Sequence, residues 1–248
     1  MKLAPAELAT IWQMLRGQPA GGTQATRLQR FYAPQAQHYD SFRERLLHGR
    51  RELAAMLPTP PGSRIVELGG GTARNLEFFG ARIRHCASFE VVDLCPALLA
   101  LARARCAGWT NVTVTEGDAR TWQPSAPVDS VYFSYALSMI PDWQHALANA
   151  LRMLKPGGTV GVVDFYLSAH AYGLGIKHHH ALARLFWCRW FAHDGVDLDA
   201  ERLRRLHSVT QRVYLYQGRA SVPYIPGLRV PYFIYLGVKP PAARHADE

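Results

Sequence analysis

The 248-residue sequence lacks paired cysteines, long apolar runs and enough acidic residues to balance its basic ones. Its four cysteines show no Cys-x-x-Cys spacing, so they indicate neither a zinc site nor a disulfide framework, and a reducing cytoplasm is expected. No stretch approaches the roughly 18 to 20 apolar residues of a spanning helix, and Glu7 lies where a signal peptide would have its apolar core. We therefore expect a cytoplasmic protein that is soluble or bound peripherally to a membrane.

The deficit of acidic residues gives a formal net charge of +9, from 28 Lys and Arg against 19 Asp and Glu. This charge favours an anionic partner, which on charge alone could be nucleic acid, an acidic ligand or an anionic lipid surface. Hydrophobic residues make up 48% of the chain, a fraction typical of a folded globular protein. The length predicts one domain with appended segments.

The most informative stretch is a short apolar run that leads into three consecutive glycines, Gly69 to Gly71, and then into the start of a helix. Glycines allow positive φ and let a ligand approach the main chain, and free N–H groups at a helix start favour an anionic group. Arg74 occupies the position where a dinucleotide fingerprint needs its third glycine. The stretch predicts a nucleoside site without a pyrophosphate, with a purely structural tight turn as the alternative.

After the glycines, apolar runs alternate with helical patterns. Strands are expected at Ala87–Asp93, Asn111–Thr115, Val128–Tyr135 and Thr159–Phe165, with helices at Pro96–Ala107 and Trp143–Leu154. This alternation predicts an α/β fold with a doubly wound, mostly parallel sheet. Beyond Phe165 a helical or irregular aromatic segment precedes two closing strands, Gln211–Tyr216 and Tyr232–Val238.

The segment before the glycines reads as helical. Leu8, Ile11, Trp12 and Leu15 share one face of an amphipathic helix, which either packs on its own domain or acts as a lid or membrane contact. Pro19 to Thr23 then reads as a connector. A second helix is expected from Asp40 to Met56, and the proline-rich residues 58–62 form a break before the glycine strand.

Acidic residues stand at the ends of successive predicted strands. Glu67 and the glycines end the first strand, and Asp93 ends the second about twenty residues on, where an acceptor for ribose hydroxyls belongs. Asp118 follows the third strand and could accept from an exocyclic amino group. A single acid at a strand end is more often a helix cap or a solvated charge, but the ordered set at one sheet edge favours a ligand site.

The order Glu67-Leu-Gly69-Gly-Gly71, Asp93, Gly117-Asp118-Ala119, Asp129 and Leu154-Lys-Pro-Gly-Gly158 resembles the class I S-adenosylmethionine-dependent methyltransferases. The resemblance implies a Rossmann-like, seven-stranded sheet and S-adenosyl-L-methionine as the cofactor. It places Gly69 and Gly71 under the methionine part, Asp93 on the ribose, and Asp118 with the Ala119 backbone on the adenine. The other cofactor-binding residues expected on this basis are Tyr39, Glu67, Thr72, Leu94 and Ser134. Ala73 departs from the pattern, because many members have their last glycine there.

Segments outside this core carry a narrower resemblance. The segments are Phe31-Tyr32, His38-Tyr39-Asp40 before a helix ending near Gly49-Arg50, Gly71-Thr-Ala-Arg-Asn-Leu76, the run from Phe133 to Trp143, Trp190-Phe-Ala-His-Asp194 and Val222-Pro-Tyr-Ile-Pro226. They resemble the N-methyltransferase of bacterial betaine-lipid synthesis, and imply successive methylation of the diacylglycerylhomoserine amine to the trimethylated lipid. Alternatives are N-methylation of phosphatidylethanolamine or a soluble amine, an RNA methyltransferase or nucleic-acid-binding protein, and a silent cofactor-binding module.

Residues expected near the reaction centre come from three parts of the chain. The catalytic candidates are Tyr32, Tyr135 and Asp164, with Tyr39, Ser134 and Tyr166 beside them. Tyrosine faces can hold a methylated ammonium by cation–π attraction, on the order of 0.5 to 2 kcal/mol per ring. The alternative for each tyrosine is half-buried packing. The amine must be neutral to attack, and either a protein base or water could take its proton.

No metal site is expected, because the consecutive histidines 178–180 would point in different directions on a helix. They are instead expected at a surface or interface, with a general base among them as an alternative. The aromatic and basic residues between Lys177 and Phe191 favour a helix at an anionic lipid interface, or alternatively a core helix with a few solvated cations. Arg202, Arg204, Arg205 and Arg212 could extend that surface.

Together these patterns predict a single methyltransferase domain over residues 1–248. It divides into a helical cap (1–57), a cofactor-binding core (62–166), an aromatic and basic insert (167–210), closing strands (211–239) and a tail (240–248). The expected partners are a lipid-linked amine and an anionic membrane surface on the inner face of the cell membrane, and not nucleic acid.

Overall fold

The computed structural model describes residues 21–35, 40, 44–170, 175–192, 195–223, 225 and 227–241. The helix expected around Leu8 to Leu15 and the candidate Tyr39 lie outside these residues. Within the described part of the chain, no helix is long and apolar enough to cross a membrane.

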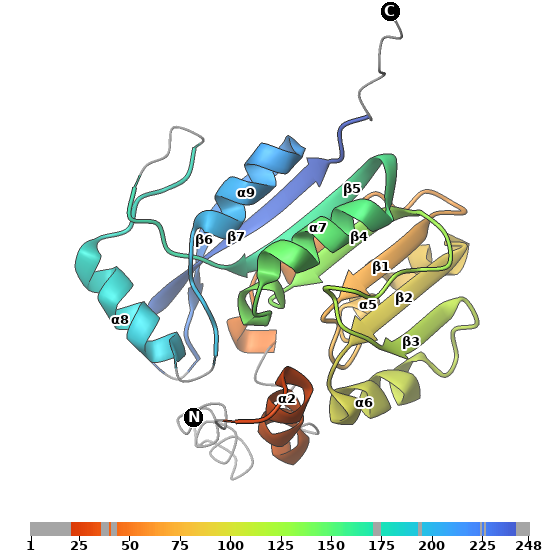
Figure 1. Ribbon diagram of the computed structural model, residues 1–248, viewed down its shortest axis with the longest axis horizontal. Helices are drawn as coiled ribbons and strands as arrows, with labels where there is room; N and C mark the ends of the chain where they lie inside the picture. The colour runs from red at the N-terminus through yellow and green to blue at the C-terminus, as the bar shows by residue number, and fades with distance from the viewer. Residues whose placement is uncertain are drawn as a thin grey trace, which may run out of the picture.

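One seven-stranded sheet runs through the molecule in the order β3-β2-β1-β4-β5-β7-β6 (Figure 1). The strands are β1 Arg64–Leu68, β2 Ser88–Asp93, β3 Val112–Glu116, β4 Val128–Ser134, β5 Leu154–Phe165, β6 Gln211–Ser221 and β7 Arg229–Val238. Strands β1 to β5 are parallel, and β7 pairs antiparallel with both β5 and β6. The predicted α/β fold with a mostly parallel sheet is therefore confirmed.

Strand β1 lies at the point where the strand order reverses, between β2 and β4. In open parallel sheets the crevice for a ligand opens at this point, outside the carboxyl ends of the strands. The glycine turn, Asp93 and the residues after Ser134 all follow these carboxyl ends. The topology therefore brings the candidate residues of three different motifs to one place.

Helices cover both faces of the sheet, because β1 is apolar on both sides. Ile65 belongs to the core that holds α4 Arg50–Met56, α5 Leu76–Phe79 and α6 Pro96–Cys106. The next residue, Val66, belongs to the opposite core with α7 Trp143–Met153 and α9 Glu201–Val209. Short 3-10 turns span Ala33–Gln35, Gly80–His85 and Leu137–Met139, labelled η1, η2 and η3. The remaining helix, α8 Ala181–Ala192, lies beside the hairpin of β6 and β7 (Figure 1).

The helix predicted from Asp40 to Met56 is interrupted, and that prediction is corrected. Residues 44–46 are helical, but Gly49 has a φ of +85° and α4 begins only at Arg50. A Cβ atom at Gly49 would lie 2.8 Å from the ring of Tyr232, so the turn at this position requires glycine. The sequence placed Gly49 inside a helical run, and only the close approach of β7 shows why the chain turns there.

Helix α2, Gln24–Tyr32, was not predicted, because its sequence is mostly polar. Its buried face is narrow, with Leu28, Phe31 and Tyr32 at helical spacing. The hydroxyl of Thr23 accepts a hydrogen bond from the backbone N–H of Thr26 at 3.2 Å and caps the helix. This cap and the i, i+3, i+4 spacing were signals of the helix that could have been read from the sequence.

Candidate functional site

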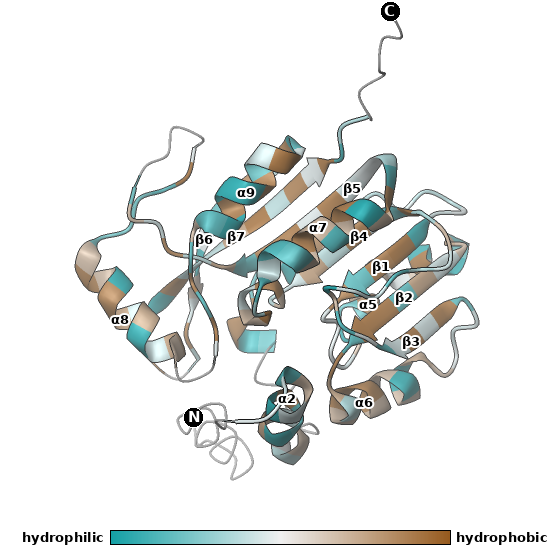
Figure 2. Cartoon of the chain, in the orientation of Figure 1, coloured by the Kyte–Doolittle hydropathy of each residue, from teal (hydrophilic) through white to brown (hydrophobic). Residues whose placement is uncertain are grey.

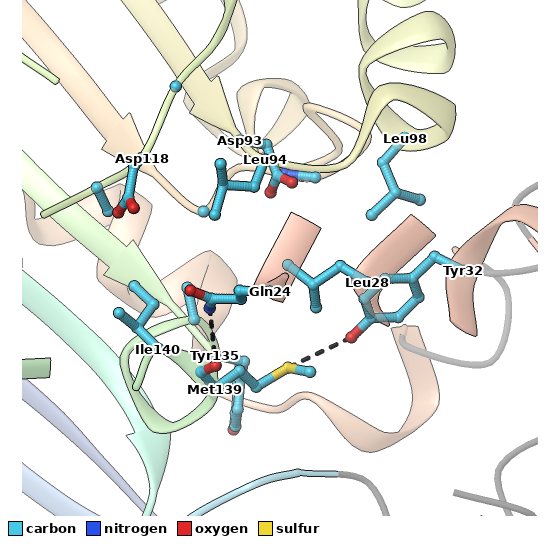
Figure 3. Close-up of a pocket in the computed structure, with 15 residues that line it drawn as sticks. Gln24, Leu28, Tyr32, Asp93, Leu94, Leu98, Asp118, Tyr135, Met139 and Ile140 are labelled. Atoms are coloured by element: carbon cyan, nitrogen blue, oxygen red, sulfur yellow. Dashed lines mark hydrogen bonds between the residues drawn. The ribbon is translucent and has the colours of Figure 1, made fainter. Parts of the chain in front are cut away.

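An open pocket, with about 580 Å³ of empty space that includes the solvent at its mouth, lies at the carboxyl ends of the central strands, between the sheet and α2 (Figure 3). It is lined by Gln24, Leu28, Tyr32, Gly69, Gly71, Asp93, Leu94, Leu98, Gly117, Asp118, Ala119, Tyr135, Ala136, Met139 and Ile140. The lining contains two carboxylates, and no lysine, arginine or histidine is among these residues. An acidic, partly apolar pocket suits a cationic ligand without phosphate groups better than a dinucleotide.

The glycine turn forms the floor of the pocket. Gly69 and Gly71 have φ values of +73° and +55°, which are costly for other residues. The backbone N–H groups of Gly69 and Gly70 donate to the carbonyl of Val92 at 2.8 and 3.1 Å, so β2 holds the turn in place. Ala73, the departure from the family pattern, has a φ of +58°. The chain therefore uses the left-handed backbone that a glycine would give, at a strain of roughly 1–2 kcal/mol.

Asp93 connects the glycine turn to the end of β2. One carboxylate oxygen accepts from the N–H of Gly71 and the other from the N–H of Cys95, both at 2.8 Å. The side chain also lines the pocket beside Leu94. A carboxylate fixed by two backbone donors keeps further lone pairs for ligand hydroxyl groups. Ribose binding by Asp93 stays a prediction.

Asp118 and Ala119 form the far wall of the pocket. The guanidinium of Arg120 donates hydrogen bonds to both carboxylate oxygens of Asp118 at 2.6 to 3.0 Å. These hydrogen bonds hold the pKa of Asp118 below its usual range. The carbonyl of Ala119 accepts from the buried Asn149 of α7 at 3.0 Å. Neither Arg120 nor Asn149 was singled out in the sequence. Together they fix the loop on which the predicted adenine contacts stand.

Helix α2 closes the pocket on the side opposite the glycine turn. Gln24 donates from Nε2 to the carbonyl of Met139 at 3.4 Å, and the hydroxyl of Tyr32 donates to the sulfur of Met139 at 3.3 Å (Figure 3). The Oε1 atom of Gln29 accepts from the N–H of Ala97 at 3.0 Å, which ties α2 to α6. Gln24, Leu28, Leu98, Met139 and Ile140 are pocket residues that the sequence analysis did not find.

Tyr135 also lines the pocket, but its hydroxyl is engaged elsewhere. It donates to the carbonyl of His48 at 2.6 Å, and its ring lies 4.6 Å from that of Phe165, centroid to centroid. Burial raises the pKa of its phenol well above the ordinary value. Its φ of +52° is unusual for an aromatic residue and marks a strained turn at the pocket wall. The ring, and not the hydroxyl, is therefore the part available to a ligand.

Five of the predicted residues that the structure describes lie outside the pocket lining. Asp164 is buried and accepts from the N–H and hydroxyl of Ser138 at 2.8 and 2.6 Å, so it holds the η3 turn from behind. Thr72 donates to Asp40 at 2.7 Å. Ser134 is buried, and its hydroxyl has no hydrogen-bond partner among the described residues. Tyr166, also considered near the reaction centre, instead donates to Gln217 on the other side of the sheet.

Glu67 is the fifth of these residues and lies fully buried under the turn. It accepts from Nδ2 of Asn75 at 2.6 Å and does not reach the pocket. Burial raises the pKa of Glu67 to about 7, against the lowering effect of the Asn75 hydrogen bond. The carboxyl that precedes the glycines therefore supports the turn from below.

Replacing Glu67 with glutamine is expected to flatten the dependence of stability on pH. The pKa of Glu67 is about 7 in the folded chain and returns to about 4.5 on unfolding, so its stabilising effect is complete below about pH 4.5 and is lost as the pH rises through 7. At about 1.4 kcal/mol per pKa unit, the loss is roughly 3 kcal/mol. Glutamine keeps an acceptor for Asn75 and carries no charge. Chemical denaturation at several pH values measures the effect, with the exposed Glu52→Gln as control; parallel curves for wild type and Glu67→Gln would contradict it.

The described histidines do not gather into a metal site. No group of three His, Cys, Asp or Glu side chains within the described ranges could hold a metal ion. His179 is buried and accepts at Nδ1 from the N–H of Ser168 at 3.1 Å, and burial lowers its pKa to about 4. His179 therefore packs as a neutral residue beside Tyr166, with ring centroids 5.0 Å apart.

Part of the chain is similar in sequence to known methyltransferases. Residues 65–158 match the model of the methyltransferase domain family. The chain is 31% identical over 120 residues to a demethylmenaquinone methyltransferase of Tropheryma whipplei, covering 48% of each chain. It is 29% identical over 126 residues to a trans-aconitate 2-methyltransferase of Azoarcus sp., covering 51% of this chain and 48% of that one. The chain thus spans about half the length of the curated relatives it matches.

Two solved structures share the fold at low sequence identity. Phosphoethanolamine N-methyltransferase 2 of Haemonchus contortus, bound to S-adenosylhomocysteine, gives a TM-score of 0.66 at 15% identity over 89% of this chain and 61% of that one. The N-methyltransferase NodS of Bradyrhizobium japonicum, also with S-adenosylhomocysteine, gives 0.56 at 15% identity over 96% of this chain and 100% of that one. These neighbours show that the chain has the fold of class I methyltransferases, and the matched residues 65–158 lie within it.

Proposed function

We propose that the chain binds S-adenosylmethionine in this pocket and transfers its methyl group to an amine. The observation that carries the proposal is the acidic lining, in which Asp93 and Asp118 line the same pocket as the backbone of Gly69 and Gly71. Asp93 would hold the ribose hydroxyls, while Leu94, Ala119 and Ile140 offer apolar contacts for the adenine. When bound, the cofactor supplies an electrophilic methyl group on a sulfonium. The lack of lining cations favours this phosphate-free, positively charged ligand.

The acceptor proposed is the amine of diacylglycerylhomoserine, methylated in successive steps to the betaine lipid. Support comes from the resemblance of the segments around Tyr32, Tyr135 and Tyr224 to the betaine-lipid N-methyltransferase. The rings of Tyr32 and Tyr135 line the pocket, where they can attract an ammonium that gains methyl groups by about 0.5 to 2 kcal/mol per ring. Positioning and exclusion of water are then the main contributions to an in-line displacement.

We propose that no protein side chain acts as the base for the amine. Asp164 faces Ser138 behind the pocket wall, and the Tyr135 hydroxyl already donates to the carbonyl of His48. Burial also raises the pKa values of both groups. Asp164 is therefore proposed as a positioning residue that holds η3, and water is proposed to take the proton that the amine loses.

The proposal includes peripheral binding to the inner face of the cell membrane, because a diacyl substrate remains in the bilayer. The formal charge of +9 supports attraction to anionic lipid. Nucleic acid is not favoured as a substrate, because the pocket lining has two carboxylates and no cation that would hold phosphate.

Initial rates of S-adenosylhomocysteine release test the acceptor class. Diacylglycerylhomoserine in mixed micelles is expected to give the highest kcat/KM, above phosphatidylethanolamine, a soluble amine, a quinol and structured RNA. A higher rate with phosphatidylethanolamine or the soluble amine would keep the N-methyl chemistry and change the acceptor. Turnover of only the quinol or the RNA would contradict N-methyl transfer, and a variant lacking Asp93 is the control for rates that do not depend on the pocket.

A further inference from the structure

Helix α8 is apolar on two sides, and the described chain covers only one of them. On the inner side Trp187 and Phe191 are buried, at 3% and 5% exposure. On the outer side Leu182 and Leu185 are 82% and 61% exposed, and Phe186 and Trp190 are 43% and 37% exposed. The outer residues follow the spacing i, i+3, i+4, i+8 and form one stripe. Figure 2 shows brown, apolar residues along α8, interrupted by teal and pale bands.

The exposed apolar stripe of α8 indicates contact with a partner. A helix that is apolar all round is normally buried on both sides. Two leucines and two aromatic residues in one stripe form a contiguous patch, and such patches mark protein or membrane contacts. A tryptophan at the edge of the stripe, with its polar N–H, is the side chain most enriched at membrane–water interfaces.

The charge around the stripe identifies the partner. Helix α8 contains no Asp or Glu and carries Arg184 and Arg189, and Lys177 precedes it. The nearest acidic residues in the sequence follow the helix, at 194, 197, 199 and 201. Arg189 borders the outer stripe next to Leu185 and Trp190. An apolar stripe on a helix whose only charged side chains are arginines complements a surface that is anionic outside and apolar beneath, which describes the headgroup region of a bilayer containing anionic lipid.

The inner side of α8 connects the stripe to the pocket. Trp190 contacts Trp187 with ring centroids 6.1 Å apart, and Trp187 contacts Phe191 at 5.7 Å. Phe191 lies 5.0 Å from Phe165, and Phe165 lies 4.6 Å from Tyr135, which lines the pocket. A continuous row of packed rings therefore runs from the exposed stripe to the pocket wall. A bilayer held at the stripe would lie at the outer end of this row, whose inner end is Tyr135.

We infer that the outer stripe of α8, formed by Leu182, Leu185, Phe186 and Trp190, docks the chain on an anionic lipid bilayer. The leucines and aromatic rings enter the boundary between headgroups and acyl chains, and Arg184 and Arg189 face the anionic headgroups. The inference rests on the proposed lipid acceptor for its purpose. Its test needs no turnover, so the two fail independently.

The test is binding of the full chain to vesicles, measured by flotation and by quenching of tryptophan fluorescence with brominated acyl chains. Vesicles of phosphatidylcholine with phosphatidylglycerol are compared with phosphatidylcholine alone. Wild type is expected to bind the anionic vesicles and to lose binding at high salt. The double variant Leu182→Asp with Leu185→Asp is expected to bind at least about tenfold more weakly. Val213→Asp is the matched control, because Val213 is 66% exposed and lies near the start of β6, outside the stripe.

The other possible outcomes either support or contradict the docking surface on α8. All variants should keep the thermal midpoint and the S-adenosylhomocysteine affinity of wild type, because the replaced side chains are exposed and outside the pocket. Equal vesicle binding by wild type and the double variant, or none by wild type, would overturn the docking surface. A dimer that the double variant dissociates would assign the stripe to a second copy. Binding that appears only after removal of residues 1–20 would assign it to that segment. Vesicle binding without lipid methylation would contradict the proposed acceptor alone.

Discussion

Replacing Asp93 with alanine is expected to weaken S-adenosylmethionine binding by about 100-fold or more. Hydrogen bonds to a charged acceptor contribute about 1.5–3 kcal/mol each, and a ribose offers two hydroxyl groups to this carboxylate. The substitution also removes the acceptor of the Gly71 and Cys95 N–H groups, so the floor of the pocket loses its link to β2. Isothermal titration with S-adenosylhomocysteine measures the effect.

Asp129→Ala is the matched control for this prediction. Asp129 likewise accepts from a backbone N–H, that of Arg64 at 2.8 Å, and pairs with Lys155 at 2.7 Å, but it stands at the opposite ends of the strands. It is expected to leave cofactor affinity unchanged. An Asp93 variant that folds and binds S-adenosylhomocysteine as tightly as the Asp129 variant would show that the ribose does not lie at β2.

Replacing Gly69 with alanine is expected to abolish cofactor binding and to lower the free energy of unfolding by roughly 2–5 kcal/mol. The φ of +73° at this position costs an L-residue about 1–2 kcal/mol. The new methyl group would also overlap with the Cβ of Ala136, which belongs to the pocket wall. Either the glycine turn or the segment after β4 must shift, and both line the site.

Gly62→Ala separates the two causes. Gly62 has a φ of +80°, and a Cβ there would meet nothing within 4 Å. Its substitution is expected to cost only the backbone strain and to leave cofactor affinity intact. Denaturant unfolding and titration of both variants give the comparison. Equal losses in the two variants would mean that the contact between Gly69 and Ala136 is not required.

The core of the site could be predicted from the sequence because its signals are local. Glycines between a strand and a helix, and acids at the ends of apolar runs, are each defined by a few neighbouring residues. Parallel strands then bring those ends to one edge without further information. The sequence therefore placed Gly69, Asp93 and Asp118 in the site, and the structure shows all three lining one pocket.

Helix α2 and the residues behind the pocket wall could not be predicted in the same way. Helix α2 is mostly polar, and its role depends on contacts with Met139 and Ala97 far along the chain. Asp164 follows the pattern of an acid near a strand end, but its carboxylate points to Ser138, and strand periodicity does not show which loop a side chain meets. The direction of the Tyr135 hydroxyl depends on its positive φ, which no local signal indicates for a tyrosine.

We propose that this pocket delivers methyl groups to a lipid amine. The most direct measurement uses S-adenosylmethionine with a deuterated methyl group, diacylglycerylhomoserine in mixed micelles, and mass spectrometry of the lipid over time. The wild-type protein is expected to give lipid species carrying one, two and then three labelled methyl groups on nitrogen. The Asp93→Ala variant is expected to give none. A lipid whose mass stays unchanged while the cofactor site is saturated would contradict it.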